Sequence, residues 1–278
     1  MTSPKVGFVG LGQIGAPMAM HLIDRPHGVT VYDVRHEATL PFLEQGATLV
    51  ADAAGVARNA SVISVMVRDD AQVRDVVGQM LPVAAPDTVI AIHSTIKAET
   101  AEQLAADASE RGVYVLDAPV SGGFMGAHEG TLAVLVGGDE AALDRCRPVF
   151  ERWAKLVVHF GPVGAGTRAK LARNLITFAS YAAAGEAQRL AEAAGLDLAA
   201  LADVVRHSDK VTGGAGSIML RTTTAPMAAD DQWHAILSNT RDLGEKDLQL
   251  ALELGDALGV DLPFAALALD RFGKGLGL

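Results

Sequence analysis

Short apolar runs alternate with alanine-rich stretches along the first part of the chain. The runs are rich in β-branched residues and end at glycine or polar residues, as strands do; they cover residues 5–10, 28–33, 60–67, 87–94, 113–120, 131–138 and 156–160. Strands buried on both faces have continuous apolar sequences of this kind, because helices cover both sides of a parallel sheet. The alternation therefore predicts βαβ units around a mainly parallel sheet, that is, an α/β domain.

From Gly164 onward the strand-like runs stop and helical spacing takes over. Residues 168–195 keep helical character for longer than a usual globular helix. Further helices are predicted over 197–208, 239–259 and 263–275. The pattern predicts two domains: an α/β domain over 1–163, and an all-helical domain over 164–278 that one long interdomain helix enters.

Composition and charge exclude several classes of partner. The 278-residue chain carries a formal net charge of −10, which argues against nucleic acid because phosphate contacts need clustered Lys and Arg. Its apolar stretches are too interrupted to span a membrane, and no secretory signal is visible. The single cysteine, Cys146, fits a reducing compartment, so we expect a cytoplasmic protein. The eight histidines lack metal-ligand spacing, and we expect no metal site.

Three glycines follow the first apolar run at the spacing G-x-G-x-x-G. Gly10 allows a tight turn, Gly12 lets the backbone approach a pyrophosphate, and Gly15 lets the next helix pack on the strand. The N–H groups of this loop would face the phosphates at the start of a helix. Alone, the pattern also fits a tight turn without a ligand. In its βαβ context it predicts a Rossmann dinucleotide-binding domain, with Leu11, Gln13 and Ile14 contacting the cofactor alongside the glycines.

The second apolar run ends in Asp33, 18 residues beyond Gly15 and close to the roughly 20 expected for a ribose-binding acid. Its carboxylate would accept hydrogen bonds from both ribose hydroxyls and repel a 2′-phosphate. This predicts NAD rather than NADP. Arg35 lies two residues further on and would suit a 2′-phosphate, so NADP stays open as the alternative.

Three further stretches make nearly the whole chain resemble the β-hydroxyacid dehydrogenase family, which includes 3-hydroxyisobutyrate dehydrogenase. They are DAPVSGG from Asp117, KLARN from Lys170 and KDLQLA from Lys246. The resemblance implies that Ser121, Gly122 and Gly123 hold a substrate carboxylate. It further implies that Lys170 is the catalytic lysine, that Asn174 orients the substrate, and that Lys246 lies near the nicotinamide. By the same matching, Met66 and Val67 line the cofactor path, and Thr95 lies beside the nicotinamide ribose.

The chemistry gives a reason for a lysine. Oxidising an alcohol by hydride transfer requires a group that removes the hydroxyl proton, and reduction requires its return. An ammonium in an apolar setting has its pKa lowered toward neutrality and can do both. Lys170 and Asn174, at i and i+4, share one helix face. On spacing alone, Lys170 with Arg168 and Arg173 beside it also fits a solvated helix face.

Some features depart from the family pattern. Lys97 and Ala98 stand where relatives have the end of an S-T-x-x-P turn, the chain ends early, and residues 207–227 match no family signature. Unlike 6-phosphogluconate dehydrogenase, the chain has no histidine or acid soon after Lys170.

The sequence and this resemblance predict an NAD-dependent oxidoreductase for a small β-hydroxy acid or its semialdehyde. The resemblance also implies a homodimer or homotetramer. An NADPH-dependent reductase of semialdehydes or γ-hydroxy acids and a catalytically silent dinucleotide-binding regulator are the alternatives.

Overall fold

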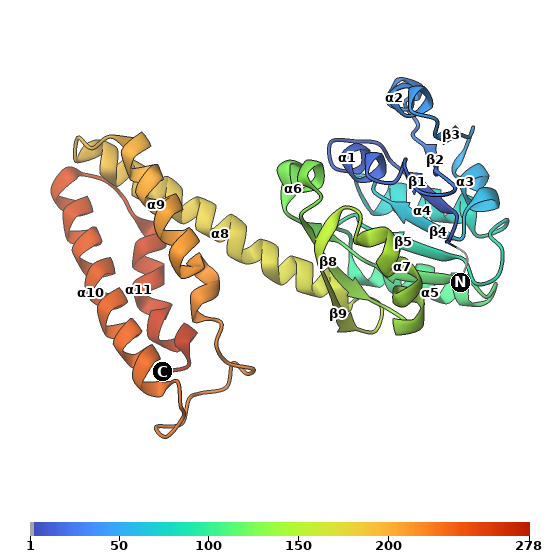
Figure 1. Cartoon of the computed structure of the whole chain (residues 1–278). Coiled ribbons are helices and arrows are strands. Elements are labelled where there is room, and N and C mark those ends of the chain that lie inside the picture. The colour runs from blue at the N-terminus through green and yellow to red at the C-terminus, as the bar shows by residue number, and fades with distance from the viewer. Residues whose placement is uncertain (1–2) are drawn as a thin grey trace. The chain divides into compact units, whose positions relative to one another are not determined.

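The computed structural model describes residues 3–278 and comprises two compact units (Figure 1). The sheet unit runs up to Arg173, and the helical unit comprises Asn174–Leu278. Among the described residues, no helix combines the length and the apolar character that crossing a membrane requires.

A mainly parallel sheet forms the centre of the sheet unit. Its strands are β1 Val6–Val9, β2 Val29–Tyr32, β3 Thr48–Leu49, β4 Val62–Val65, β5 Val89–Ile92, β6 Tyr114–Asp117, β7 Val120–Ser121, β8 Leu132–Gly137 and β9 Ala154–Gly161. They lie in the order β3-β2-β1-β4-β5-β6-β8-β7, with β9 beside β8. From β3 to β6 all pairs are parallel, whereas β8 runs antiparallel to β6 and β7. The order 3-2-1-4-5-6 is that of the Rossmann fold and confirms the predicted class.

Two strand predictions need correction. The run 113–120 divides into β6 and β7 because Pro119 lies between them and has no N–H for the ladder. The edge strand β3, Thr48–Leu49, was not predicted, since two residues are too short to leave a periodic signal.

Two hydrophobic clusters fill opposite faces of this sheet. Within β5, Val89 and Ala91 belong to one cluster and Ile90 and Ile92 to the other, as expected when successive side chains point to opposite faces. The covering helices are α1 Gly15–Met20, α2 Leu40–Glu44, α3 Ala53–Asn59, α4 Asp70–Met80, α5 Ala98–Ser109, α6 Gly123–Glu129 and α7 Glu140–Phe150. The sheet is therefore covered on both sides, as predicted.

The helical unit is built from long helices. They are α8 Ala165–Ala193, which begins in the sheet unit, α9 Leu198–Thr212, α10 His234–Leu258 and α11 Pro263–Leu276; a 3-10 turn covers Gly214–Ile218. Helices α10 and α11 pack closely, since a Cβ at Gly244 would lie 2.2 Å from the Phe272 ring. The buried Glu186 of α8 accepts hydrogen bonds from the backbone N–H groups of Phe264 and Ala265. This carboxylate thereby caps the start of α11.

The division between the units falls inside α8, beyond the predicted domain boundary at 163. The first turn of α8 packs directly on strands of the sheet: a Cβ at Gly166 would lie 2.3 Å from the carbonyl oxygen of Leu135 in β8. For this reason the sheet unit extends to Arg173 and includes Lys170.

Candidate active site

The parallel strands bring most of the predicted site residues to one edge of the sheet. Gly10 follows β1, Asp33 follows β2, Met66 follows β4 and Thr95 follows β5, all at carboxyl ends. Ser121 ends β7, shortly after β6. The strand order reverses between β1 and β4, and in open α/β sheets ligands bind at the carboxyl ends beside such a reversal.

The glycine loop has the geometry that its sequence predicts. Gly10 has a φ of +92°, and a Cβ there would lie 2.1 Å from the Met66 carbonyl oxygen. A Cβ at Gly15 would lie 2.0 Å from the Gly10 carbonyl oxygen, so α1 packs tightly on the loop. At Gly12 no atom lies within 4 Å of a Cβ position. Gly10 thus permits the turn and Gly15 the close packing of α1, while Gly12 leaves open backbone of the kind a pyrophosphate approaches. The loop fits a dinucleotide.

The other loop residues take different positions. Leu11 is buried, Ile14 is half-buried at the start of α1, and Gln13 is exposed. The Leu11 N–H donates a hydrogen bond to Asp33 Oδ2 at 2.7 Å, so the predicted ribose-binding acid also ties the glycine loop to the end of β2.

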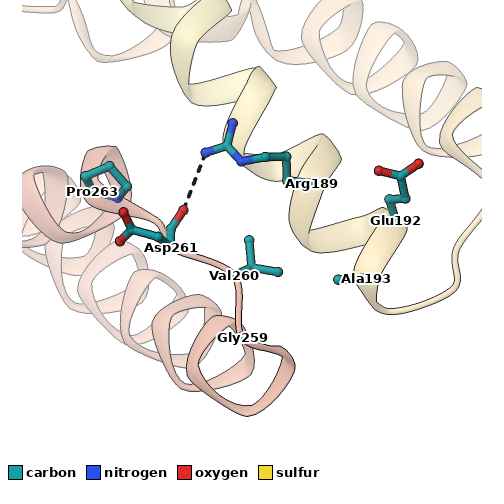
Figure 2. A pocket seen from close by; sticks show the side chains of 7 residues that line it. All are labelled: Arg189, Glu192, Ala193, Gly259, Val260, Asp261 and Pro263. Atoms are coloured by element: carbon teal, nitrogen blue, oxygen red, sulfur yellow. Dashed lines mark hydrogen bonds between the residues drawn. The ribbon is translucent and has the colours of Figure 1, made fainter.

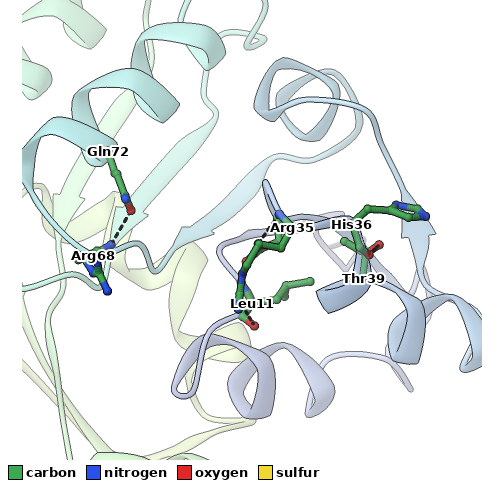
Figure 3. Close-up of polar contacts among 7 residues, drawn as sticks. Leu11, Arg35, His36, Thr39, Arg68 and Gln72 are labelled. Carbon is green, nitrogen blue, oxygen red and sulfur yellow. Dashed lines mark hydrogen bonds and ion pairs between the residues drawn. The ribbon is translucent and has the colours of Figure 1, made fainter.

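Arg35 forms an ion pair with Asp33, and its side chain lies beside Leu11 of the glycine loop (Figure 3). Asp33 Oδ1 accepts hydrogen bonds from the Arg35 backbone N–H at 2.8 Å and from Nε at 3.2 Å. Burial raises the pKa of the Asp33 carboxyl, but the N–H donors of Arg35 and Leu11 outweigh it, so the pKa lies below its ordinary value. The acid is ionised at neutral pH. The Arg35 side chain is 55% exposed and carries its charge beside the glycine loop.

Ser94 anchors the loop after β4, a role that the sequence analysis missed. Its Oγ donates a hydrogen bond to the Val67 carbonyl at 2.7 Å and accepts one from the Val67 N–H at 3.0 Å. Met66 and Val67 are half-buried, as suits residues lining a path. The available signal was a polar residue two positions after the buried strand β5.

Asp70 defines the turn where the chain departs from the family pattern. Its Oδ1 accepts hydrogen bonds from the Lys97 N–H at 3.0 Å and from Thr100 Oγ1 at 2.5 Å. This carboxylate fixes the start of α5. Thr95, just before this turn, is exposed.

The Ser-Gly-Gly turn lies between β7 and α6. Gly122 and Gly123 have φ values of +133° and +64°, which other residues rarely adopt. Both glycines are exposed, Ser121 is half-buried, and a Cβ at Gly123 would meet no atom within 4 Å. The turn therefore exposes the backbone of both glycines to solvent.

Lys170 is buried, at 8% exposed, although its neighbours Arg168 and Leu171 are exposed. A solvated helix face, the alternative from spacing alone, does not describe it. Burial, with a smaller effect from the charge of Arg173, lowers the pKa of Lys170 to about 8. Near neutral pH this amine can therefore both donate and accept a proton.

Two predicted residues belong to the helical unit. Asn174 follows Lys170 by one turn on α8 and is half-buried. Lys246 lies on α10, is exposed, and forms an ion pair with Asp247 at 2.5 Å. Their roles in substrate and cofactor binding stay predictions.

A separate hollow in the helical unit lies beside the end of α8 and the turn between α10 and α11 (Figure 2). Arg189 Nη2 donates a hydrogen bond to the Asp261 carbonyl at 3.4 Å there. None of the predicted site residues lines it. Within residues 3–278, no three His, Cys, Asp or Glu side chains gather as metal ligands would.

These features define a Rossmann dinucleotide-binding protein with a second, helical unit. Residues 5–161 match the family described as the NAD binding domain of 6-phosphogluconate dehydrogenase. Residues 164–275 match the family described as NAD-binding of NADP-dependent 3-hydroxyisobutyrate dehydrogenase. The chain belongs to the β-hydroxyacid dehydrogenase family, as its motifs predicted.

Individual relatives agree with this assignment. An uncharacterized oxidoreductase of Mycobacterium tuberculosis is 56% identical over 99% of this chain and 94% of its own. The 3-hydroxyisobutyrate dehydrogenase of Pseudomonas aeruginosa is 35% identical over 96% of this chain and 90% of its own. A crystal structure of an oxidoreductase from Mycobacterium avium 104 superposes with a TM-score of 0.95, with 53% identity and 99% of both chains covered.

Proposed function

We propose that this oxidoreductase interconverts a small β-hydroxy acid and its semialdehyde or keto acid with NAD, and that Lys170 transfers the proton. The observation that carries the proposal is the buried Lys170 amine in the sheet unit. Burial lowers the pKa of this amine to about 8. Few lysines are buried without an ionic partner unless the neutral amine has a use.

In oxidation, the neutral Lys170 amine accepts the proton of the substrate hydroxyl as the carbonyl forms. In reduction, the ammonium returns it. A bound nicotinamide ring supplies the two-electron acceptor or donor for this exchange. An amine with a pKa near the working pH suits both directions, because each protonation state is then well populated.

The glycine loop holds the cofactor in this proposal. Backbone at Gly12 approaches the pyrophosphate, with Leu11, Gln13 and Ile14 around it. Asp33 binds the adenosine ribose. Met66 and Val67 line the path toward the nicotinamide, which Thr95 and Lys246 flank.

The substrate carboxylate binds at Ser121, Gly122 and Gly123, and Asn174 orients the molecule. Support comes from the left-handed backbone of both glycines and the open space at Gly123. Further support comes from the name of the P. aeruginosa relative, a 3-hydroxyisobutyrate dehydrogenase. A hydroxy acid of similar size is the substrate we propose.

NAD is the cofactor we propose, because the ionised Asp33 repels a 2′-phosphate. A carboxylate has about four lone-pair sites, and the three N–H donors of Leu11 and Arg35 leave about one of them on Asp33 for a ribose hydroxyl. The exposed guanidinium of Arg35 specifically favours the second candidate, an NADPH-dependent reductase. The ion pair between Arg35 and Asp33 offsets that charge.

A second copy of the chain is the macromolecular partner we propose, and the cytoplasm is its expected location. The helical unit leaves Phe178, Tyr181 and Leu250 more than half exposed. Apolar surface of this kind marks sites of association.

An absorbance assay at 340 nm tests the function. A panel of about ten small hydroxy acids is offered with NAD and with NADP, and Lys170→Met serves as the matched blank. We expect turnover with a three- to five-carbon β-hydroxy acid and NAD. Asp33→Ala should narrow the preference for NAD over NADP by about tenfold or more, which is about 1.4 kcal/mol. If no hydroxy acid in the panel is turned over with either cofactor although NADH binds, the result would favour the alternative of a catalytically silent dinucleotide-binding regulator.

A further inference from the structure

Asp117, the last residue of β6, is a fully buried acid to which the proton transfer proposed above assigns no role. Its Oδ1 accepts a hydrogen bond from the Gly164 N–H at 2.7 Å, and its Oδ2 accepts one from the Thr167 N–H at 2.6 Å. The donors lie 47 and 50 residues further along the chain, at the start of α8. One carboxylate therefore joins the end of a central strand to the helix that carries Lys170.

The start of α8 has no cap of its own. The first N–H groups of a helix lack partners within it, and α3, α4, α7 and α9 each begin with an aspartate that accepts from such an N–H. These caps are Asp52, Asp69, Asp139 and Asp197. Before α8 stands Gly164, which has no side chain to offer. Asp117 supplies the missing acceptor from another element.

Close packing adds to this attachment. A Cβ at Gly137 in β8 would lie 2.3 Å from Asp117 Oδ1 and 2.8 Å from the Gly166 nitrogen. A Cβ at Gly166 would lie 2.6 Å from the Asp117 carbonyl oxygen. The first turn of α8 thus fits against β6 and β8 only because both positions are glycine.

We propose that Asp117 is a positioning residue: by capping α8 from strand β6, it fixes the place of the Lys170 amine at the carboxyl edge of the sheet. Thr167 and Lys170 are three residues apart and lie on one face of α8. A shift of the capped turn therefore moves the amine directly. The effect on turnover rests on the proposed function, whereas the anchoring of Lys170 does not.

Asp117→Asn is the first test, because it keeps the size of the side chain and one acceptor oxygen. Its NH2 group would face one of the two N–H donors, so one hydrogen bond is lost. We expect kcat to fall about tenfold in Asp117→Asn and about 100-fold in Asp117→Ala, the scale for a reacting group displaced by about 1 Å. The Kd for NADH should change less than about twofold. Asp139→Asn and Asp139→Ala, which alter the local cap of α7, are the matched controls and should retain kcat.

A second readout needs no turnover. Acetic anhydride acetylates neutral amines, and mass spectrometry can follow the Lys170 peptide against the exposed Lys155 as internal reference. When acetylation is measured over a range of pH, its midpoint at Lys170 should lie near pH 8 in the wild type, because the pKa of Lys170 is lowered to about 8. In Asp117→Asn it should rise toward the ordinary lysine value, since a loosened helix start lets water reach the amine.

Lower kcat together with a raised acetylation midpoint supports the proposal. An Asp117 variant whose melting temperature falls no further than that of the Asp139 controls, and which keeps both kcat and the acetylation midpoint, would overturn the proposal. Asp117 would then have a merely structural role. Should Lys170→Met prove fully active, the proposed function fails and the acetylation midpoint alone decides the anchoring. If Asp117→Ala does not fold, the isosteric Asn variant decides.

Discussion

The two units of this chain differ in how they hold themselves together. The sheet unit buries large side chains such as Phe8, Phe150 and Trp153 completely. In the helical unit, the buried hydrophobic side chains are Ala191, Leu237, Leu262 and Leu276. Aromatic and branched side chains of its helices are instead exposed; Phe178, Leu175 and Val211 are each more than 60% exposed. The sheet unit thus carries its own core of large side chains, whereas the helical unit leaves much of its apolar surface exposed.

A matched pair of truncations gives the largest expected effect and tests the difference between the two units. Phe150→Ala should cost about 3–5 kcal/mol of unfolding free energy, because it leaves a cavity among fully buried rings that include His93 and Trp153. Phe178→Ala, at a side chain 63% exposed, should cost less than about 1 kcal/mol in dilute protein.

Urea unfolding at two protein concentrations measures both costs. If a second copy covers the helical unit, the cost of Phe178→Ala should grow with concentration, while that of Phe150→Ala stays constant. Equal costs at both positions in dilute protein would contradict the difference between the units.

The next largest effect is the pH dependence of stability that a buried histidine gives to the core of the sheet unit. His93 is buried, with Nδ1 2.8 Å from the Ala118 carbonyl and Nε2 3.0 Å from Ser64 Oγ. Burial, opposed by the contact with Ala118, lowers the pKa of His93 to about 4. Unfolded histidine titrates near 6.5, so between pH 6.5 and 4 only the unfolded chain binds this proton. Stability should fall by about 3 kcal/mol as pH drops through that window.

Denaturant unfolding from pH 7 to pH 4 measures this loss. His93→Gln should remove most of the slope contributed by this site, whereas His27→Gln, at an exposed histidine, should leave the slope unchanged. An identical slope in wild type and His93→Gln would refute the buried neutral imidazole.

The smallest effect lies in the helical unit. Glu186→Gln removes one of the two acceptors that cap α11 at Phe264 and Ala265, and should cost about 1 kcal/mol. Glu192→Gln, at an exposed glutamate on the same helix, is the control and should be neutral. Thermal melting followed by circular dichroism separates the two. A neutral Glu186→Gln would show that α11 needs no cap from α8.

Local patterns were enough to predict most strands of the sheet, the long helix and the glycine loop, because each depends on neighbours in sequence. The caps that Asp117 and Glu186 provide were missed, since each joins residues that only the folded chain brings together. Asp70 and Ser94 were missed for the same reason. The burial of Lys170 also depends on tertiary packing, and spacing alone left it open.

The central claim is that the Lys170 amine moves the proton of the reaction, and the pH dependence of kcat/KM for oxidation of a small β-hydroxy acid by NAD tests it most directly. The wild-type rate should rise about tenfold per pH unit and level off near pH 8, where the pKa of Lys170 lies. In Lys170→Met this rise should vanish, and the rate above pH 8 should be about 100- to 10,000-fold lower, with NADH binding retained. The same rise and plateau in Lys170→Met, at near wild-type rate, would contradict the claim.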